Sequence, residues 1–343
     1  MATTKVLILT EGSQDIGFGH LTRCLSIAQA FEERGIQPFF VVYGDSTVGK
    51  VLDGVPYKVF AWFEDLERLK GFLKGTDIVV VDSYKAPLEV YQTIASTSKV
   101  ALYIDDDRRL EYPRGIVLNP TVGAENFTYP EGEGKEYLLG AKYIPLRKPF
   151  WDVPPKKVNQ KVEKVLITFG GDDLRSLTPK VLKLLNDHFG ELKKFVVIGG
   201  GFKKETVEQI KSLKGQKTEL IFNADAKLMK TLMLESDIAI SAGGQTLYEL
   251  ARVGTPAVAV GVVDNQKYNL QNWQKLGFIE FAGYWNSPEL ESRILDGINK
   301  LLPYGERLKR LNLGRSLVDG QGARRVVSYL LEKLKRVKEE LQP

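Results

Sequence analysis

The chain has 343 residues, of which 43% are hydrophobic and 27% charged, a globular composition too long for one ordinary core. Its 48 basic and 43 acidic residues give a net charge of +5 spread along the sequence, which favours a small anionic ligand over a nucleic acid. A single cysteine, Cys24, excludes an internal disulfide. Because only His20 and His188 are available as imidazole ligands, we expect no metal and no cofactor.

The sequence shows no pattern of export or membrane insertion. No apolar segment reaches the roughly 18 residues that a membrane-spanning helix needs. The first strand pattern begins at about residue 5, without the basic, apolar and small-residue order of a signal peptide. We therefore expect a cytoplasmic protein with no stable membrane insertion.

Short apolar segments alternate with helical patterns in the first half, which is typical of parallel βαβ units. The run Ile78 to Val81 has no polar alternation, as in a central parallel strand covered on both faces. Strands are predicted over 5–9, 38–43, 57–60, 78–81 and 100–104, and helices over 21–34, 65–73 and 87–96. The first half is therefore predicted to be a doubly wound sheet.

The same order of elements restarts after a segment, 145–162, that is rich in proline and lysine and predicts a linker. Further strands are predicted over 165–169, 195–198, 218–222, 238–241 and 257–260, followed by helices to about residue 337. We predict two Rossmann-like parallel-sheet domains, 1–150 and 163–343, facing one another. Ligands of such sheets bind outside the carboxyl ends of the strands, so the cleft between the domains is the expected site.

A glycine-rich loop with a histidine, GFGHLTR over 17–23, lies between the first strand and the first helix. Glycines let the backbone approach a ligand, and the helix N-terminus offers N–H donors to an anion. His20 is placed where an imidazole can act as a base near neutral pH. The alternative is a turn whose histidine only caps or packs. The glycine spacing differs from the dinucleotide-binding fingerprint, which disfavours an NAD enzyme.

A second small-residue loop, SAGGQTLYEL over 241–250, also joins a strand to a helix. Its main-chain N–H groups, hydroxyls and helix dipole suit a diphosphate, and Glu249 in the second helical turn suits ribose hydroxyls. A tight turn with a surface charge is the alternative. The candidate nucleotide-binding residues are Gly170, Gly171, Ser241, Ala242, Gly243, Gly244, Gln245, Thr246 and Glu249.

Further polar residues follow other predicted strands. Asn265 and Gln266 can hydrogen-bond sugar hydroxyls or acetamido groups, although Asp264 or Asn265 can equally cap a helix. Two polar groups end strands of the first half: Asp82-Ser83-Tyr84 and Asp105-Asp106-Asp107. At that edge of the sheet they can position a sugar or orient His20. For the second group, an exposed acidic turn is the alternative. The candidate sugar-binding residues are Gly19, Arg23, Tyr84, Asp105, Asn265 and Gln266.

Together these motifs resemble the UDP-2,4-diacetamido-2,4,6-trideoxy-β-L-altropyranose hydrolases of pseudaminic acid biosynthesis and the related spore-coat polysaccharide hydrolases. The most specific element is IGFGH over 16–20, followed by Arg23 and Ala28, and the likeness extends to about Gly277. Peptidoglycan N-acetylglucosaminyltransferases share the Gly-x-Gly-His loop and the loop ending in Glu249. The resemblance implies the two-domain GT-B architecture.

The resemblance also implies a reaction: hydrolysis of the bond between the anomeric carbon and the diphosphate, with a UDP-sugar as substrate and UDP as product. In it His20 deprotonates the attacking water, while Gly243 and Gly244 hold the leaving diphosphate. Glu249 would bind the ribose and Asn265 the sugar. Displacement at an anomeric carbon needs a poised nucleophile and charge stabilisation of the departing phosphate, and two domains can supply one each.

Three alternatives remain open on sequence grounds. A GT-B glycosyltransferase differs only in that a sugar hydroxyl attacks in place of water; Phe18, Trp62 and Phe63 are the residues available for a membrane-facing patch. A nucleotide-sugar 2-epimerase would need acid/base pairs, and because the chain has only two histidines, carboxylates would have to supply them. A non-catalytic nucleotide-sugar-binding protein would have no need of a titrating imidazole.

Overall fold

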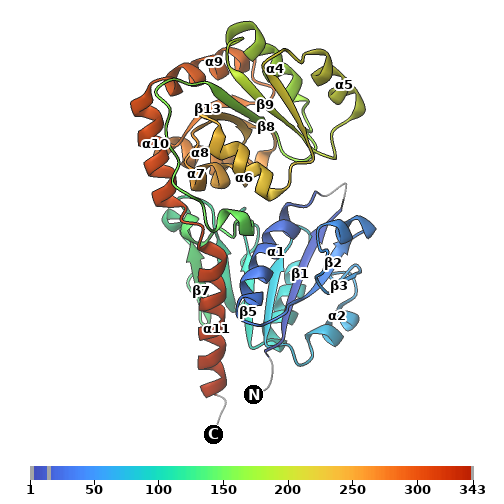
Figure 1. Ribbon diagram of the computed structural model, residues 1–343. Helices are drawn as coiled ribbons and strands as arrows, with labels where there is room; N and C mark the ends of the chain where they lie inside the picture. The colour runs from blue at the N-terminus through green and yellow to red at the C-terminus, as the bar shows by residue number, and fades with distance from the viewer. Residues whose placement is uncertain (1–3, 14–16, 341–343) are drawn as a thin grey trace. The chain divides into compact units, whose positions relative to one another are not determined.

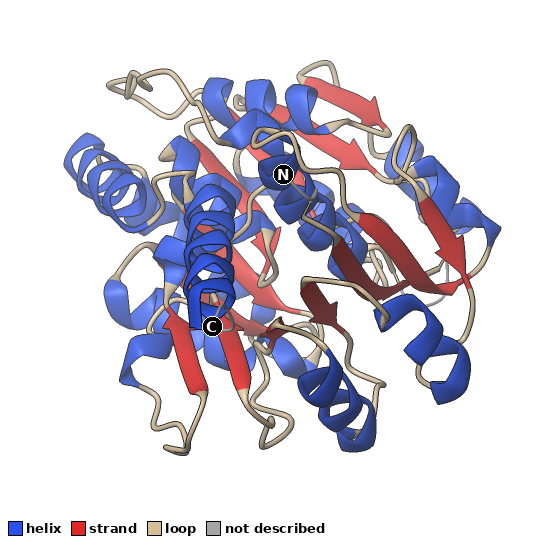
Figure 2. Cartoon of the chain, turned by 90° about the horizontal axis from the view of Figure 1, so that it is seen from below, coloured by secondary structure: helices blue, strands red, loops and turns tan. Residues whose placement is uncertain are grey.

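The computed structural model describes residues 4–13 and 17–340, and the chain divides into two compact units (Figure 1). The first unit takes the chain up to Arg147 and again from Gly320, and the second takes Lys148 to Asp319. Each unit is a parallel sheet covered by helices, as Figure 2 shows in a second view. The two parallel-sheet α/β domains predicted from the sequence are therefore confirmed.

The first unit is built on a seven-stranded sheet in the order β3-β2-β1-β4-β5-β6-β7, with all described pairs parallel. Its strands are β1 (Val6–Gly12), β2 (Phe39–Gly44), β3 (Tyr57–Val59), β4 (Ile78–Asp82), β5 (Val100–Ile104), β6 (Gly115–Asn119) and β7 (Lys135–Leu139). Its helices are α1 (Gly19–Glu32), α2 (Leu66–Leu73), α3 (Leu88–Thr97) and α11 (Gly322–Glu340). The winding direction reverses between β1 and β4, and such a reversal opens a crevice at the carboxyl ends of the two strands.

The second unit is built on a six-stranded parallel sheet in the order β10-β9-β8-β11-β12-β13. Its strands are β8 (Lys164–Thr168), β9 (Lys193–Ile198), β10 (Thr218–Phe222), β11 (Ile238–Ala242), β12 (Ala257–Gly261) and β13 (Ile279–Tyr284). Its helices are α4 (Leu177–His188), α5 (Lys204–Ser212), α6 (Ala226–Glu235), α7 (Thr246–Val253), α8 (Lys267–Leu276), α9 (Leu290–Leu301) and α10 (Tyr304–Leu317). Here the winding reverses between β8 and β11.

Hydrophobic patterning accounts for the elements that carry the candidate residues. The β4 sequence IVVVD is buried at every position, as expected for a strand covered on both faces. In α1, Leu21, Cys24, Ile27 and Phe31 form a buried stripe at helical spacing. The helix ends before Gly35, whose φ of +72° suits a residue without a side chain.

The C-terminal helix α11 differs from its predicted place in a domain 163–343, because it packs on the first unit, next to α1 and β5. Its apolar stripe of Val326, Val327, Leu330 and Leu334 is buried. Gly322 permits the approach, since a Cβ there would lie 2.1 Å from the carbonyl oxygen of Ile144. Strands β6, β7 and β13 were not predicted.

Candidate functional site

His20 lies at the carboxyl edge of the first sheet, in the first turn of α1, which follows β1 at the reversal point. Gly17 in the preceding loop has φ of +84°, and a Cβ at Gly17 or Gly19 would meet no atom of the described residues within 4 Å. The loop is therefore open toward the edge of the sheet. Ile16, named in the sequence motif, lies outside the described residues.

Asp82, the last residue of β4, holds the imidazole of His20. Its Oδ1 lies 2.8 Å from His20 Nδ1, and the Asp82 side chain is 1% exposed. Burial alone would raise the pKa of the Asp82 carboxyl, but the charges of Arg23 and His20 hold that pKa well below its usual range. An ionised carboxylate only accepts hydrogen bonds, so Nδ1 of His20 carries the proton.

That tautomer leaves Nε2 of neutral His20 with a lone pair, the arrangement of a general base oriented by a carboxylate. Burial lowers the pKa of His20, but the charge of Asp82 and its hydrogen bond outweigh burial, and the net pKa is raised above its ordinary value. The ring also packs edge-on against Tyr84, with centroids 4.4 Å apart. The imidazole is thus fixed in both rotation and tautomer.

Arg23, one turn further along α1, is buried with its donors directed at two carboxylates. Its Nε and Nη2 donate to Asp82 at 2.8 and 2.7 Å, and Nη1 donates to Asp106 at 2.6 Å. The phenol of Tyr84 donates to the other oxygen of Asp106 at 2.6 Å. The structure therefore joins residues from three separate sequence motifs into one network.

Glu11, which sequence reasoning did not single out, completes this network from β1. Its Oε2 accepts from the Ser83 hydroxyl at 2.7 Å and its Oε1 from the backbone N–H of Tyr84 at 3.0 Å. The side chain is 2% exposed. The available signal was an acidic residue next to last in an otherwise apolar strand, where a buried carboxylate needs several donors.

Asp105 follows β5 and is buried apart from the His20 network. Its Oδ1 accepts the backbone N–H of Arg109 at 3.1 Å, while Oδ2 is buried without a hydrogen-bond partner among the described residues. Burial raises the pKa of this carboxyl to about 6. The residue remains a candidate for sugar binding, with an unsatisfied acceptor.

In the second unit, the loop over 243–245 connects β11 to α7 at the reversal point. A Cβ at Gly243 would lie 2.6 Å from Cγ of Leu270, so the main chain packs closely there. Of the residues that the structure describes, a Cβ at Gly244 would meet only the amide of Gln266, at 3.7 Å. Among the described residues, the side chain of the N-cap residue Gln245 does not cap α7. This end can therefore offer main-chain N–H groups to an anion.

Other predicted nucleotide-binding residues lie around the same edge. Ser241 is buried, and its hydroxyl donates to the carbonyl of Ala242 at 3.1 Å. Glu249 is 3% exposed and lies in the first turn of α7, not in the second turn as predicted. Gly170 and Gly171 follow β8, the neighbour of β11. Gln245 and Thr246 begin α7 and are half-buried. The reversal point thus gathers all the candidates of this unit except Asn265 and Gln266.

Asn265 and Gln266 belong to the 3-10 helix η5 (Asp264–Gln266) after β12. Gln266 Oε1 accepts the backbone N–H of Val262 at 3.0 Å, and its amide is the group that faces Gly244. Asn265 is exposed. Neither Asp264 nor Asn265 caps η5 or α8 through its side chain, so the capping alternative is wrong.

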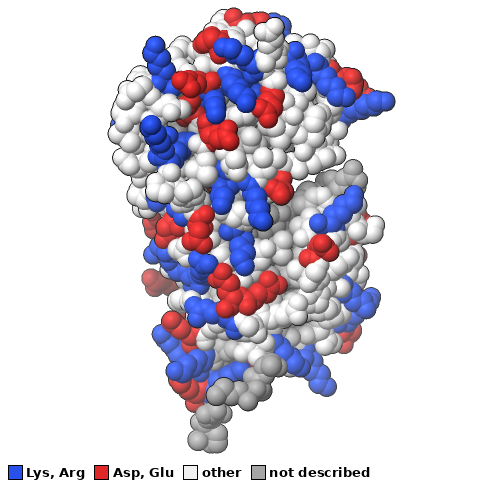
Figure 3. All heavy atoms as spheres, viewed as in Figure 1, with Lys and Arg blue, Asp and Glu red and all other residues white. Residues whose placement is uncertain are grey.

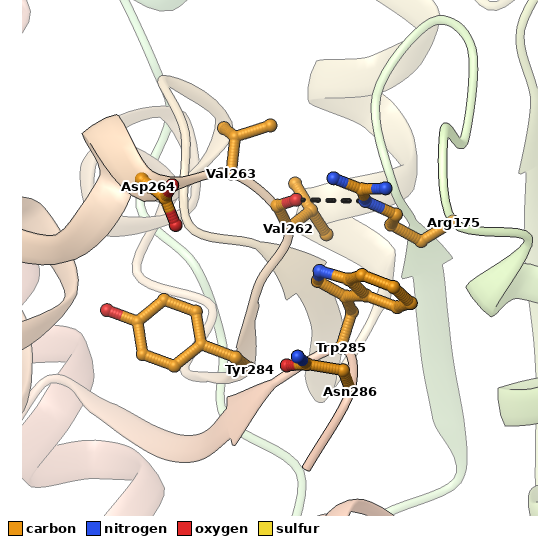
Figure 4. Close-up of a pocket in the computed structure, with 7 residues that line it drawn as sticks. All are labelled: Arg175, Val262, Val263, Asp264, Tyr284, Trp285 and Asn286. Atoms are coloured by element: carbon orange, nitrogen blue, oxygen red, sulfur yellow. Dashed lines mark hydrogen bonds between the residues drawn. The ribbon is translucent and has the colours of Figure 1, made fainter.

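An open pocket of about 290 Å³ lies next to this loop (Figure 4). The Arg175 guanidinium lies 4.3 Å from the centroid of the Trp285 ring, and its Nε donates to the Val262 carbonyl at 3.3 Å. Asp264 and Tyr284 form the other side. Sequence reasoning missed Arg175 and Trp285, because neither stands in a recognisable motif.

Three further observations concern surface charge, membrane-spanning helices and metal ligands. On the face that Figure 3 shows, Lys and Arg are interspersed with Asp and Glu over both units. Over residues 4–13 and 17–340, no helix is long and apolar enough to cross a membrane. Within the same described ranges, no three His, Cys, Asp or Glu side chains are grouped as metal ligands.

The second unit is similar to a known family of domains. Residues 165–310 match the glycosyltransferase family 28 C-terminal domain. The structure is also similar to MurG of Acinetobacter baumannii, with a TM-score of 0.67 at 17% identity, over 96% of this chain and 99% of that one. The likeness confirms the GT-B architecture expected from the sequence.

Curated relatives confirm the predicted resemblance. An uncharacterized protein of Methanocaldococcus jannaschii is 29% identical over 75% of this chain and 55% of its own length. A Helicobacter pylori protein named as pseudaminic acid cytidylyltransferase and UDP-2,4-diacetamido-2,4,6-trideoxy-β-L-altropyranose hydrolase is 24% identical, over 80% of this chain and 48% of that protein. A Campylobacter jejuni protein with the same hydrolase name is 23% identical, over 68% of this chain and 89% of that protein. The chain thus spans about half the length of the first two relatives.

Proposed function

We propose that this chain, whose residues 165–310 match a glycosyltransferase family 28 C-terminal domain, hydrolyses a UDP-linked diacetamido-trideoxy sugar. The products are UDP and the free sugar, for the biosynthesis of a nonulosonic acid such as pseudaminic acid or of a surface polysaccharide. The observation that carries the proposal is the 2.8 Å contact between Asp82 and Nδ1 of His20, which leaves Nε2 as a base. The hydrolase names of the Helicobacter and Campylobacter relatives support the choice of substrate.

In the proposed reaction, Nε2 of His20 takes a proton from water as the water oxygen bonds to the anomeric carbon. The bond from that carbon to the diphosphate oxygen breaks, and its electron pair leaves with UDP. Asp82 stabilises the imidazolium that forms, as the carboxylate does in a Ser-His-Asp triad. Every bond and proton is accounted for without a cofactor, and we propose that no metal is needed.

The second unit is proposed to bind the nucleotide. Main-chain N–H groups at Gly244 and the N-terminus of α7 would stabilise the negative charge of the leaving diphosphate, while Gly243, whose own N–H donates to the Val260 carbonyl at 3.2 Å, lets the loop pack closely. Glu249 would accept hydrogen bonds from the ribose. Asn265 and Gln266, with Tyr84 and the main chain of Gly19 from the first unit, would contact the sugar. We place this activity in the cytoplasm.

The test is release of UDP from UDP-2,4-diacetamido-2,4,6-trideoxy-β-L-altropyranose without an acceptor and in the presence of EDTA. His20→Asn should abolish release, while His188→Asn, the matched change at the other histidine, should leave it intact because His188 is exposed at the end of α4. UDP release that continues in His20→Asn would overturn the assignment of the base. Binding of UDP without release by the wild type would favour a glycosyltransferase or a non-catalytic binding protein.

A further inference from the structure

The buried guanidinium of Arg23 makes contacts that a sugar-binding role would not explain. It is 7% exposed, and its Nε, Nη1 and Nη2 all donate to carboxylates at 2.6 to 2.8 Å. A guanidinium presents its donors in a fixed plane, so one that joins Asp82 to Asp106 cannot also turn toward a ligand. Three of the five N–H groups of Arg23 are therefore committed to the two aspartates, which hold the guanidinium in place.

Asp106 transmits this arrangement to Tyr84. Burial alone would raise the pKa of the Asp106 carboxyl, but Arg23 and the Tyr84 hydroxyl lower it, so the group is ionised and only accepts. Its Oδ2 is used by Arg23 and its Oδ1 by the phenol. The Tyr84 proton is thereby committed to Asp106, and the phenol oxygen has only lone pairs to offer.

We propose that Arg23 and Asp106 are positioning residues that fix the Tyr84 hydroxyl as a hydrogen-bond acceptor, and that Tyr84 recognises an acetamido N–H of the sugar. The choice of ligand group follows from this polarity. A sugar hydroxyl both donates and accepts and would adapt to either orientation of the phenol, whereas an amide N–H only donates and needs a fixed acceptor. This inference rests on the proposed function for the identity of the substrate.

The same network leaves a hydrogen-bond acceptor on both His20 and Tyr84. His20 is oriented by Asp82 as Tyr84 is by Asp106, and Arg23 binds both carboxylates. The charged and titratable groups around the imidazole are Asp82, Arg23, Asp106 and Tyr84. One cation thus keeps two carboxylates ionised, and each of these aligns one group of the site.

A double-mutant cycle on kcat/KM separates this role from a general structural one. Tyr84→Phe and Asp106→Asn should each lower kcat/KM by about 10- to 100-fold, since a hydrogen bond involving a charged group is lost or misaligned. The loss should fall mainly on KM. The double variant should be no worse than Tyr84→Phe alone, because Asp106 acts through the phenol. Asp107→Asn, an isosteric change at the exposed neighbour, is the control and should match the wild type.

Losses that multiply in the double variant would overturn the inference. A second readout needs no substrate and stays informative if the wild type does not hydrolyse the sugar. Proton NMR of the free protein should show a downfield, slowly exchanging hydroxyl proton that is absent in Tyr84→Phe and shifted in Asp106→Asn and Arg23→Lys. A Tyr84 hydroxyl proton that neither Asp106→Asn nor Arg23→Lys shifts would also overturn it, whatever the activity.

Discussion

Oδ1 of Asp82 accepts hydrogen bonds from two residues of α1, from Nδ1 of His20 at 2.8 Å and from Nη2 of Arg23 at 2.7 Å. One buried carboxylate therefore fixes the tautomer of the imidazole and neutralises the guanidinium one turn away. Both donors come from the same helix face because they are three residues apart. The candidate base and its orientation are thus set by a single strand-to-helix pairing, β4 with α1.

Asp82→Asn should lower kcat by roughly 1,000- to 10,000-fold, as loss of the orienting carboxylate does in a Ser-His-Asp triad. The carboxamide can donate to Nδ1 of His20, which places the proton on Nε2 and removes the base. The charge of Asp82 also raises the pKa of His20, so the acidic limb of residual kcat/KM should move to lower pH. Rates across pH 4 to 9 check both effects; an unchanged limb would contradict the pairing.

Asp105 gives a prediction about stability against pH. Its folded pKa, about 6, lies above the ordinary value for an aspartate, so the folded state binds the proton more tightly than the unfolded chain. The stability it contributes is present below pH ~4 and is lost as pH rises through 6, with an upper bound of roughly 3 kcal/mol. Asp105→Asn should remove this loss.

Denaturant unfolding of the wild type and of Asp105→Asn from pH 4 to 8 measures the effect. The free energy of unfolding of the variant, minus that of the wild type, should increase as the pH rises, with most of the change between pH 4 and 7. Contributions of the other ionisable groups cancel in the difference. Parallel curves would mean that Asp105 is not held protonated by its burial.

The assignment of α11 to the first unit predicts where its core substitutions act. Leu330 is fully buried on the face toward that unit, and Arg324 pairs with Glu33 at 2.7 and 2.9 Å. Leu330→Ala should cost about 2–5 kcal/mol of unfolding free energy. Lys335→Ala on the exposed face of the same helix should cost little.

Hydrogen exchange locates the loss. In Leu330→Ala the amides of α1 and β5, which α11 contacts, should exchange faster, while those of β11 and β12 should not. Faster exchange confined to the second unit would contradict the assignment. The comparison needs no knowledge of the substrate.

Local patterns in the sequence predict the strands that surround both reversal points, because fully buried apolar runs such as Ile78 to Val81 are unambiguous. The peripheral strands β6, β7 and β13 escaped prediction; β7 is the edge of its sheet and only its Leu138 is buried. The packing of α11 on the first unit was also not predicted, because the sequence of an amphipathic helix does not indicate which sheet the helix covers. Long-range pairing decides that.

The candidate site shows the same division. Strand ends and glycine loops predict that His20, Tyr84 and Asp105 lie at one edge of a sheet, and the structure places them there. The sequence does not reveal that Arg23 is shared between Asp82 and Asp106, because such partners lie about 60 to 80 residues apart. Hydrogen-bond partners depend on register and rotamer, which local patterns do not determine.

The two glycines of the loop after β11 provide a matched pair of substitutions. A Cβ at Gly243 would lie 2.6 to 2.8 Å from three carbons of the buried Leu270 side chain, so Gly243→Ala should cost about 1–3 kcal/mol of stability through overpacking. Gly244→Ala should fold as the wild type does, because within the described part of the chain its Cβ would meet only the Gln266 amide, at 3.7 Å.

If this loop binds the diphosphate, Gly244→Ala should nevertheless weaken UDP binding, by about 10-fold or more, because the added methyl occupies the space through which the phosphate approaches the main chain. Calorimetric titration with UDP, beside thermal unfolding of both variants, separates the two effects. Wild-type affinity for UDP in Gly244→Ala would move the diphosphate away from α7, toward Gly170 and Gly171 after β8, the other strand of the same reversal point.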